Sequence, residues 1–97
     1  MNKAEMISKV SRNTGFSVSV VSPIVENLLD SIIETLSSGE SVGFRGFGKF
    51  EVSQRAERVA RNPRNNTEVS VPEKVVPRFL AGTTLKSRVA EGNLNND

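Results

Sequence analysis

The strongest pattern in the chain is an apolar stripe between positions 20 and 36. Apolar residues recur there in adjacent pairs every four positions, which places them on one side of an α-helix. The stripe consists of Val20, Val21, Ile24, Val25, Leu28, Leu29, Ile32, Ile33 and Leu36. It is broader than one short neighbouring helix covers, and Gly39 follows it as a stop signal. The pattern predicts a long amphipathic helix that needs more than one packing partner.

The start of this helix has two interpretations, because a proline lies near it. If Ser17 or Ser19 caps the helix, Pro23 removes an internal hydrogen bond and kinks the first turns. If Ser22 caps it, Pro23 occupies the first helical position, where no bond is lost. The sequence leaves both open.

A shorter helix is predicted to come first. Asn2 is a suitable N-cap, with Glu5 three residues later as in a capping box. Gly15 suits the left-handed position that ends a helix. One face of this helix contains Met6, Ile7 and Val10.

From Ser41 onward the pattern becomes that of β-strands. Residues with high β propensity are interrupted by glycines, which mark bends or close backbone approach. The apolar residues of this region are Val42, Phe44, Phe47, Phe50 and Val52, and the glycines are Gly43, Gly46 and Gly48.

Residues 54–74 carry few apolar side chains. They are polar and Arg-rich, and residues 62–66 form a turn signal at their centre. A hairpin of this composition lacks the apolar residues to fold against a core, so we expect an arm that projects into solvent.

The end of the chain returns to an apolar pattern. Val75, Val76 and Phe79 are expected in the core, followed by a short helix near residues 83–90. Residues 93–97 are expected to form a flexible tail. The elements together predict an α+β fold with one domain, residues 1–92.

Composition narrows the possible functions. A chain of 97 residues with 36% apolar residues buries a modest core, which makes dimerisation a physical expectation. The absence of Cys and His excludes disulfides, thiol chemistry and the usual zinc sites. No metal site, cofactor, catalytic pair, signal peptide or membrane span is predicted, so we expect a cytoplasmic protein that is not an enzyme.

Charge is concentrated in one part of the chain. The formal charge is −2 for residues 1–43, +4 for residues 44–64 and zero for the remainder. Arginine recurs every three residues along the predicted arm, at Arg55, Arg58, Arg61 and Arg64. Spaced cations on an extended element suit the repeating phosphates of DNA, although an exposed hairpin also uses Arg for solubility. Pro63 stands at the tip, where its apolar ring could act either as a wedge between base pairs or as an ordinary turn proline.

Four motifs in their order resemble the HU and integration host factor family over essentially residues 1–90. They are Gly46-Phe47-Gly48-Lys49-Phe50, Arg61-Asn62-Pro63, Val76-Pro77-Arg78-Phe79-Leu80-Ala81-Gly82 and Leu85-Lys86. The resemblance implies an intertwined dimer with a helical base, an antiparallel β saddle and two extended β-ribbon arms. It further implies that the arms enter the minor groove and that the tip proline intercalates and kinks the duplex.

The resemblance and the residue patterns together predict two sets of functional residues. The DNA-binding set is Lys3, Arg45, Arg55, Arg58, Arg61, Asn62, Pro63, Arg64, Arg78 and Lys86. The dimer core is predicted to contain Leu29, Ile32, Ile33, Leu36, Phe44, Phe47, Phe50 and Phe79. The partner is expected to be double-stranded DNA of the bacterial nucleoid, with bent, nicked or flexible duplex favoured, bound by a homodimer or a heterodimer.

Three departures from the family pattern remove cations: Val75, Leu80 and Thr83 stand where many relatives carry Lys or Arg. Glu57 also adds an acid to the arm, and Arg78 and Arg88 offset part of the loss. A less basic saddle is expected, and with it weaker non-specific affinity, a shallower salt dependence or greater reliance on bent or damaged DNA. Arg45, in Phe44-Arg45-Gly46-Phe47-Gly48, resembles the integration host factor branch, so a site-preferring DNA bender is the alternative function. A structural dimer without DNA binding is a third hypothesis, against which the intact arm argues.

Overall fold

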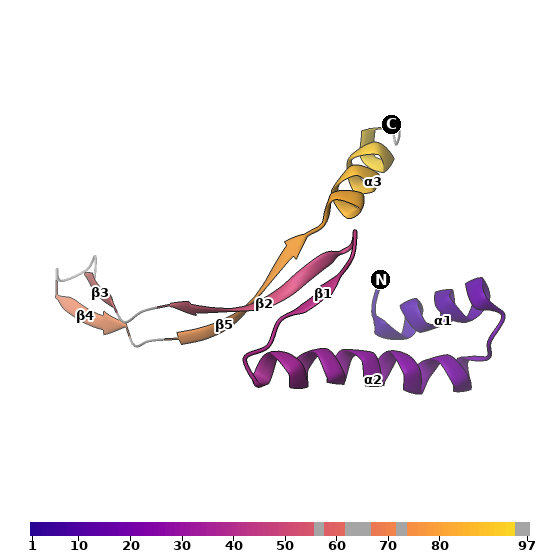
Figure 1. The fold of residues 1–97 in the computed structure, drawn as a ribbon, viewed down its shortest axis with the longest axis horizontal. Coiled ribbons are helices and arrows are strands. Elements are labelled where there is room, and N and C mark those ends of the chain that lie inside the picture. Colours follow the sequence, from indigo (N-terminus) through magenta and orange to yellow (C-terminus); the bar gives the residue numbers. More distant parts are fainter. Residues whose placement is uncertain (56–57, 62–66, 72–73, 95–97) are drawn as a thin grey trace. The chain divides into compact units, whose positions relative to one another are not determined.

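The computed structural model describes the backbone of residues 1–55, 58–61, 67–71 and 74–94, and their side chains except at residues 55, 58–61 and 69–71. Contacts divide the chain into two compact units: a helical unit, Met1–Thr35, and a sheet unit, Leu36–Asp97. The described residues form three helices and five strands (Figure 1). That residues 1–92 behave as one domain stays a prediction.

Helix α1, Lys3–Thr14, has the predicted caps at both ends. The Glu5 backbone N–H donates to Oδ1 of Asn2 at 2.9 Å, which satisfies one of the unpaired donors of the first turn. Gly15 has φ 81° and its N–H donates to the Ser11 carbonyl at 2.9 Å, so the left-handed cap expected of this glycine is confirmed.

Helix α2, Val18–Ser37, begins at the earlier of the two predicted starts. The Ser17 carbonyl accepts from the N–H groups of Val20 and Val21, each at 3.0 Å, so the helix is already formed before Pro23. Pro23 therefore lies inside the helix and has no N–H to donate to the carbonyl of Ser19. Gly39 has φ 89° and follows the end of the helix as predicted.

Within the stripe of α2 only Val21 is buried; the stripe residues Val25, Ile32 and Leu36 are half-buried, and the others are exposed. Val21 is 4% exposed, and Ile7 of α1 is 5% exposed. At 100° per residue, Ile24 and Leu28 lie to one side of Val21, and Leu29 and Ile33 lie to the other. All four are exposed, Ile33 by 63%. The chain alone therefore leaves much of its longest apolar stripe uncovered.

The main sheet consists of β1, Val42–Phe44, β2, Gly48–Arg55, and β5, Lys74–Ala81, in antiparallel order β1-β2-β5 (Figure 1). A tight turn joins β1 to β2: the Phe47 N–H donates to the Phe44 carbonyl at 3.0 Å, and Gly46 has φ 81°. This is the φ that a type II turn requires at its third position. Phe47, expected in a strand, is therefore a turn residue.

The arm predicted for residues 54–74 is an antiparallel hairpin in its described part. The β2–β5 ladder ends at the pair Arg55 and Lys74. Beyond it, β3, Arg58–Arg61, pairs with β4, Glu68–Val71, as a separate two-stranded ladder. Asn62, Pro63 and Arg64, predicted at the tip, lie outside the described residues.

Helix α3, Thr83–Leu94, is longer than predicted. The expectation placed its end near residue 90 and a flexible tail from residue 93, but Asn93 and Leu94 are helical. The Asn93 side-chain amide donates to the Val89 carbonyl at 2.8 Å, a bond to the preceding turn that supports the extra residues. Residues 95–97 lie outside the described part of the chain.

Candidate nucleic-acid interface

The register of the main sheet separates two faces with different chemistry. Residues that pair across antiparallel strands point to the same side, and the side alternates at each step along a strand. Phe50 pairs with Phe79, whereas its neighbour Glu51 pairs with Arg78. One face, called here the apolar face, contains Val42, Phe44, Phe50, Val52, Pro77 and Phe79. The other, called here the basic face, contains Lys49, Glu51, Ser53, Lys74, Val76, Arg78 and Leu80.

The basic face presents three described cations against one described acid. Lys49, Lys74 and Arg78 are all exposed, and Glu51 is half-buried. Nζ of Lys49 lies 3.9 Å from Oε2 of Glu51. Arg78 was predicted as a DNA-contacting residue, and the structure places it on this face. Lys49 and Lys74 were absent from the predicted DNA-binding set. The pairing register of β2 and β5 decides on which face they lie, and the sequence pattern did not predict that register.

The three departures from the family pattern do not lie together. Leu80 pairs with Lys49 and belongs to the basic face, where a cation would add to it directly. Val75 pairs with Gln54, on the side of the apolar face. Thr83 is the first residue of α3. Of the three, only Leu80 removes a charge from the basic face.

Two glycines fix the geometry at the end of the sheet. A Cβ at Gly48 would overlap the Phe79 ring and would lie 2.8 Å from the Leu80 carbonyl oxygen. A Cβ at Gly82 would lie 2.7 Å from the Gly46 carbonyl oxygen. Because Gly82 has no side chain, its backbone approaches the turn closely. The Gly82 N–H donates to the Phe47 carbonyl at 2.8 Å, and the Leu85 N–H donates to the Gly46 carbonyl at 3.1 Å. The β1–β2 turn is thereby tied to the first turn of α3.

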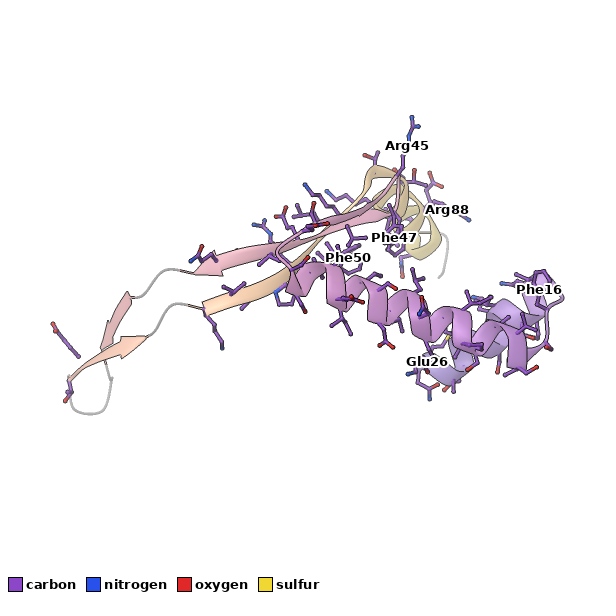
Figure 2. All side chains as sticks on the ribbon, turned by 60° about the horizontal axis from the view of Figure 1, so that its bottom comes forward. Phe16, Glu26, Arg45, Phe47, Phe50 and Arg88 are labelled. Atoms are coloured by element: carbon purple, nitrogen blue, oxygen red, sulfur yellow. The ribbon has the colours of Figure 1, made fainter. Side chains whose placement is uncertain are left out.

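Arg45, at this turn, lies beside two hollows in the sheet unit. One, of about 530 Å³, also contains Arg88 of α3 and an apolar wall of Phe47, Leu85 and Val89. The other, of about 360 Å³, contains Lys49 and Leu80 of the basic face. Figure 2 shows Arg45 on the turn and Arg88 on the adjacent helix. Arg45 was predicted as a contact residue, and Arg88 was expected to offset part of the missing basic charge; the two line the same hollow, and their contact with DNA stays a prediction.

The remaining predicted contact residues occupy separate places. Lys86 is exposed on α3 and does not line the larger hollow. Nζ of Lys3, in the helical unit, lies 2.7 Å from Oε1 of Glu26 and is thus already paired. Arg55, Arg58 and Arg61 are placed by backbone register opposite Lys74, Val71 and Glu68. Arg61 therefore stands across the ladder from an acid.

The predicted dimer-core aromatics form one cluster. Ring centroids of Phe50 and Phe79 are 4.7 Å apart, and those of Phe47 and Phe79 are 5.7 Å apart. Phe44 contacts Phe47 and Phe50 edge-on at 6.3 and 6.5 Å. Such aromatic pairs prefer an apolar environment, yet Phe47 is 50% exposed and Phe44 and Phe79 are also exposed. The four rings contact one another within the single chain, and their role in a dimer core stays a prediction.

Among the described residues there is no cluster of three or more His, Cys, Asp or Glu side chains with the geometry of a metal site. No described helix is long and apolar enough to span a bilayer. What the basic face itself presents is a set of exposed cations on an extended surface.

Comparisons with known proteins agree with this chemistry. A family model described as bacterial DNA-binding protein matches residues 1–90. The SPbeta prophage-derived DNA-binding protein HU 2 of Bacillus subtilis is 44% identical over 89 residues, covering 92% of this chain and 97% of that protein. Integration host factor subunit beta of Chromobacterium violaceum is 39% identical over 94 residues, covering 92% of this chain and 90% of that protein.

Solved structures give the same result. The cocrystal structure of Anabaena HU with DNA has a TM-score of 0.83 and 36% identity, covering 93% of this chain and 98% of that one. HU from Thermotoga maritima has a TM-score of 0.66 and 32% identity, covering 92% and 98%. The chain therefore belongs to the bacterial DNA-binding protein family of HU and integration host factor.

Proposed function

We propose that this protein is an architectural protein that binds the minor groove of double-stranded DNA and bends it, with little base-specific readout. The observation that carries the proposal is the basic face of the sheet. Its strands β2 and β5 end at the pair Arg55 and Lys74, beyond which β3 carries two further arginines. A row of cations along an extended element matches the spacing of DNA phosphates.

In the proposed mechanism the arm and its tip have different roles. Arg55, Arg58 and Arg61 neutralise phosphates beside the minor groove, whose narrow form attracts arginine. Pro63 enters a base step as an apolar wedge without an N–H donor, and Asn62 and Arg64 flank it. Unstacking a step costs about a few kcal/mol, offset by contacts that the bent flanks then make. Insertion of such wedges is a property of minor-groove architectural proteins, among them HU and integration host factor.

The functional form is proposed to be an intertwined homodimer. The supporting observation is that apolar surface is exposed on both described units, on the stripe of α2 and in the phenylalanine cluster. A second copy offers the matching surfaces by twofold symmetry. Two basic faces and two arms would then contact one duplex, with Arg45, Arg88, Lys86 and Lys3 as candidate contacts to its bent flanks.

A site-preferring DNA bender is the second candidate, and a specific residue favours it. Arg45 stands at a turn between two hollows. A guanidinium inserted into the minor groove from this turn would bind more strongly where the groove is narrow, which depends on the DNA sequence. Relatives at 39% and 37% identity include subunits of integration host factor, so a heterodimer is part of this alternative. Competition between random duplex and a site selected from a random pool separates the two candidates, because a shape-selective binder gains little from selection.

The main proposal is tested by binding to linear, nicked and pre-bent duplexes of equal length at two salt concentrations. We expect tighter binding to the nicked and pre-bent forms, since the protein does not have to supply the energy of a bend that is already present. We also expect a shallower salt dependence than that of HU from Geobacillus stearothermophilus, a 42% identical relative, because Leu80 leaves the basic face one cation short. Absence of binding to all three duplexes would refute the proposal.

A further inference from the structure

Glu51 is the one acid among the described residues of the basic face, and it stands between two cations. Its carboxylate lies 3.9 Å from the Lys49 ammonium two residues earlier on the same strand. Directly across the ladder it faces Arg78. Opposite charges at such cross-strand positions attract each other. Lys49 keeps 53% of its side chain exposed and Glu51 keeps 30%, so both are accessible to a ligand.

An acid in this position affects a polyanion in two ways. It repels phosphates that approach the face, and it attracts the neighbouring cations: Lys49 through the ion pair at 3.9 Å, and Arg78 from the position opposite it on the next strand. Exposed ion pairs are weak, so a DNA phosphate can displace the Glu51 carboxylate from a cation. The free energy gained when that cation binds phosphate is then reduced by the free energy of the ion pair that is lost. Electrostatic contacts to phosphate supply essentially all of the affinity for straight, non-specific duplex. The apolar contacts of an inserted wedge depend less on these electrostatic contacts to phosphate.

We propose that Glu51 is a specificity-determining residue that competes with DNA phosphate for Lys49 and Arg78. Glu51 thereby limits the salt-dependent affinity of the basic face for phosphate, which contributes to the binding of DNA of any shape. The inference rests on the proposed DNA-binding function and deepens it. It gives the acid a role on a face whose other charged residues, within the described part of the chain, are cations.

The test is a double-substitution cycle on the full chain, with Glu51→Gln, Lys49→Gln and both together. The probe is a straight, unnicked duplex at several salt concentrations. Glu51→Gln is expected to raise affinity at low salt by about two- to fivefold per subunit. It is expected to steepen the slope of log K against log salt by about 0.9 for each additional phosphate that the protein neutralises. Lys49→Gln alone should change affinity by less than it does in the Glu51→Gln background.

Glu34→Gln is the matched control, since it removes the same charge from an exposed position on α2. It should leave the slope unchanged. Equal effects of Lys49→Gln in the two backgrounds would overturn the inference, as would an unchanged slope in Glu51→Gln or an equal increase in affinity from the control. If no variant, including the wild type, bound DNA, the proposed function itself would fail. If the wild type bound and the cycle showed no coupling, only the role of Glu51 would fail.

Discussion

Gly82 and Gly92 lie at opposite ends of α3 and meet different surroundings. A Cβ at Gly82 would lie 2.7 Å from the Gly46 carbonyl oxygen. This neighbour is a backbone atom, so the clash is not relieved by rotation of a side chain. Nothing lies within 4 Å of a Cβ at Gly92. We predict that Gly82→Ala destabilises the fold by about 1–3 kcal/mol through overpacking. Gly92→Ala should be neutral or stabilising by up to about 1 kcal/mol.

Urea unfolding of the two variants beside the wild type measures both effects at the same protein concentration. The comparison is matched, since each variant adds one methyl group to α3 or its cap. Equal midpoints for Gly82→Ala and the wild type would show that the β1–β2 turn packs against α3 more loosely than the structure describes.

Pro63 carries the mechanical part of the proposed function. Pro63→Ala should preserve folding and much of the affinity, because the arginines remain, but should reduce bending, because alanine offers a smaller wedge. Ring closure of short DNA fragments in the presence of protein measures bending directly. Pro72→Ala, which removes another proline from the arm sequence, is the control. Unchanged ring closure by Pro63→Ala would contradict the intercalation mechanism.

At the scale of elements, the ion pair between Lys3 of α1 and Glu26 of α2 connects stability to binding. The two side chains are 52% and 44% exposed, so the pair contributes at most about 1 kcal/mol. Glu26→Gln frees Lys3 for phosphate. We predict a small loss of thermal stability together with tighter binding at low salt to duplexes long enough to reach Lys3.

Asp30→Asn, one turn farther along α2, is the control for this substitution, because it removes a charge without breaking a described ion pair. Fluorescence anisotropy with a short and a long duplex, each at two salt concentrations, provides the readout. An increase in affinity that is the same for both variants would assign the effect to net charge and not to the release of Lys3.

Elements were predictable from the sequence where one periodic pattern decided them. The caps of α1, the span of the α2 stripe and the arm hairpin were all derived from spacing and turn residues. The end of α3 was placed too early, and three other features were not predictable. The start of α2 depends on which serine precedes the first helical bond, and Phe47 is placed by the φ of Gly46. The faces of the sheet depend on pairing between β2 and β5, a long-range register that no local pattern contains. Lys49, Lys74 and Glu51 were missed for that reason.

At the scale of the whole molecule, the exposed apolar residues of α2 bear on the oligomeric state of the protein in solution. Ile33 is 63% exposed in the single chain, although it belongs to the same stripe as the buried Val21. A monomer would leave this surface in water at a cost of about 25 cal/mol per Å² of apolar area. If a second copy covers it, folding and association are coupled, and the melting temperature rises with protein concentration.

Ile33→Asp places a charge in the predicted dimer core. It should yield a monomeric or unfolded chain, because a buried carboxylate without a partner is strongly unfavourable. Leu94→Asp introduces the same charge at a residue that is 77% exposed and lies beyond the family-matched residues 1–90, so it should leave the dimer intact. Sedimentation equilibrium on the wild type and both variants measures the outcome. A wild type that sediments as a monomer with a concentration-independent melting temperature would remove the dimer from the proposed function, and with it the pairing of two arms on one duplex.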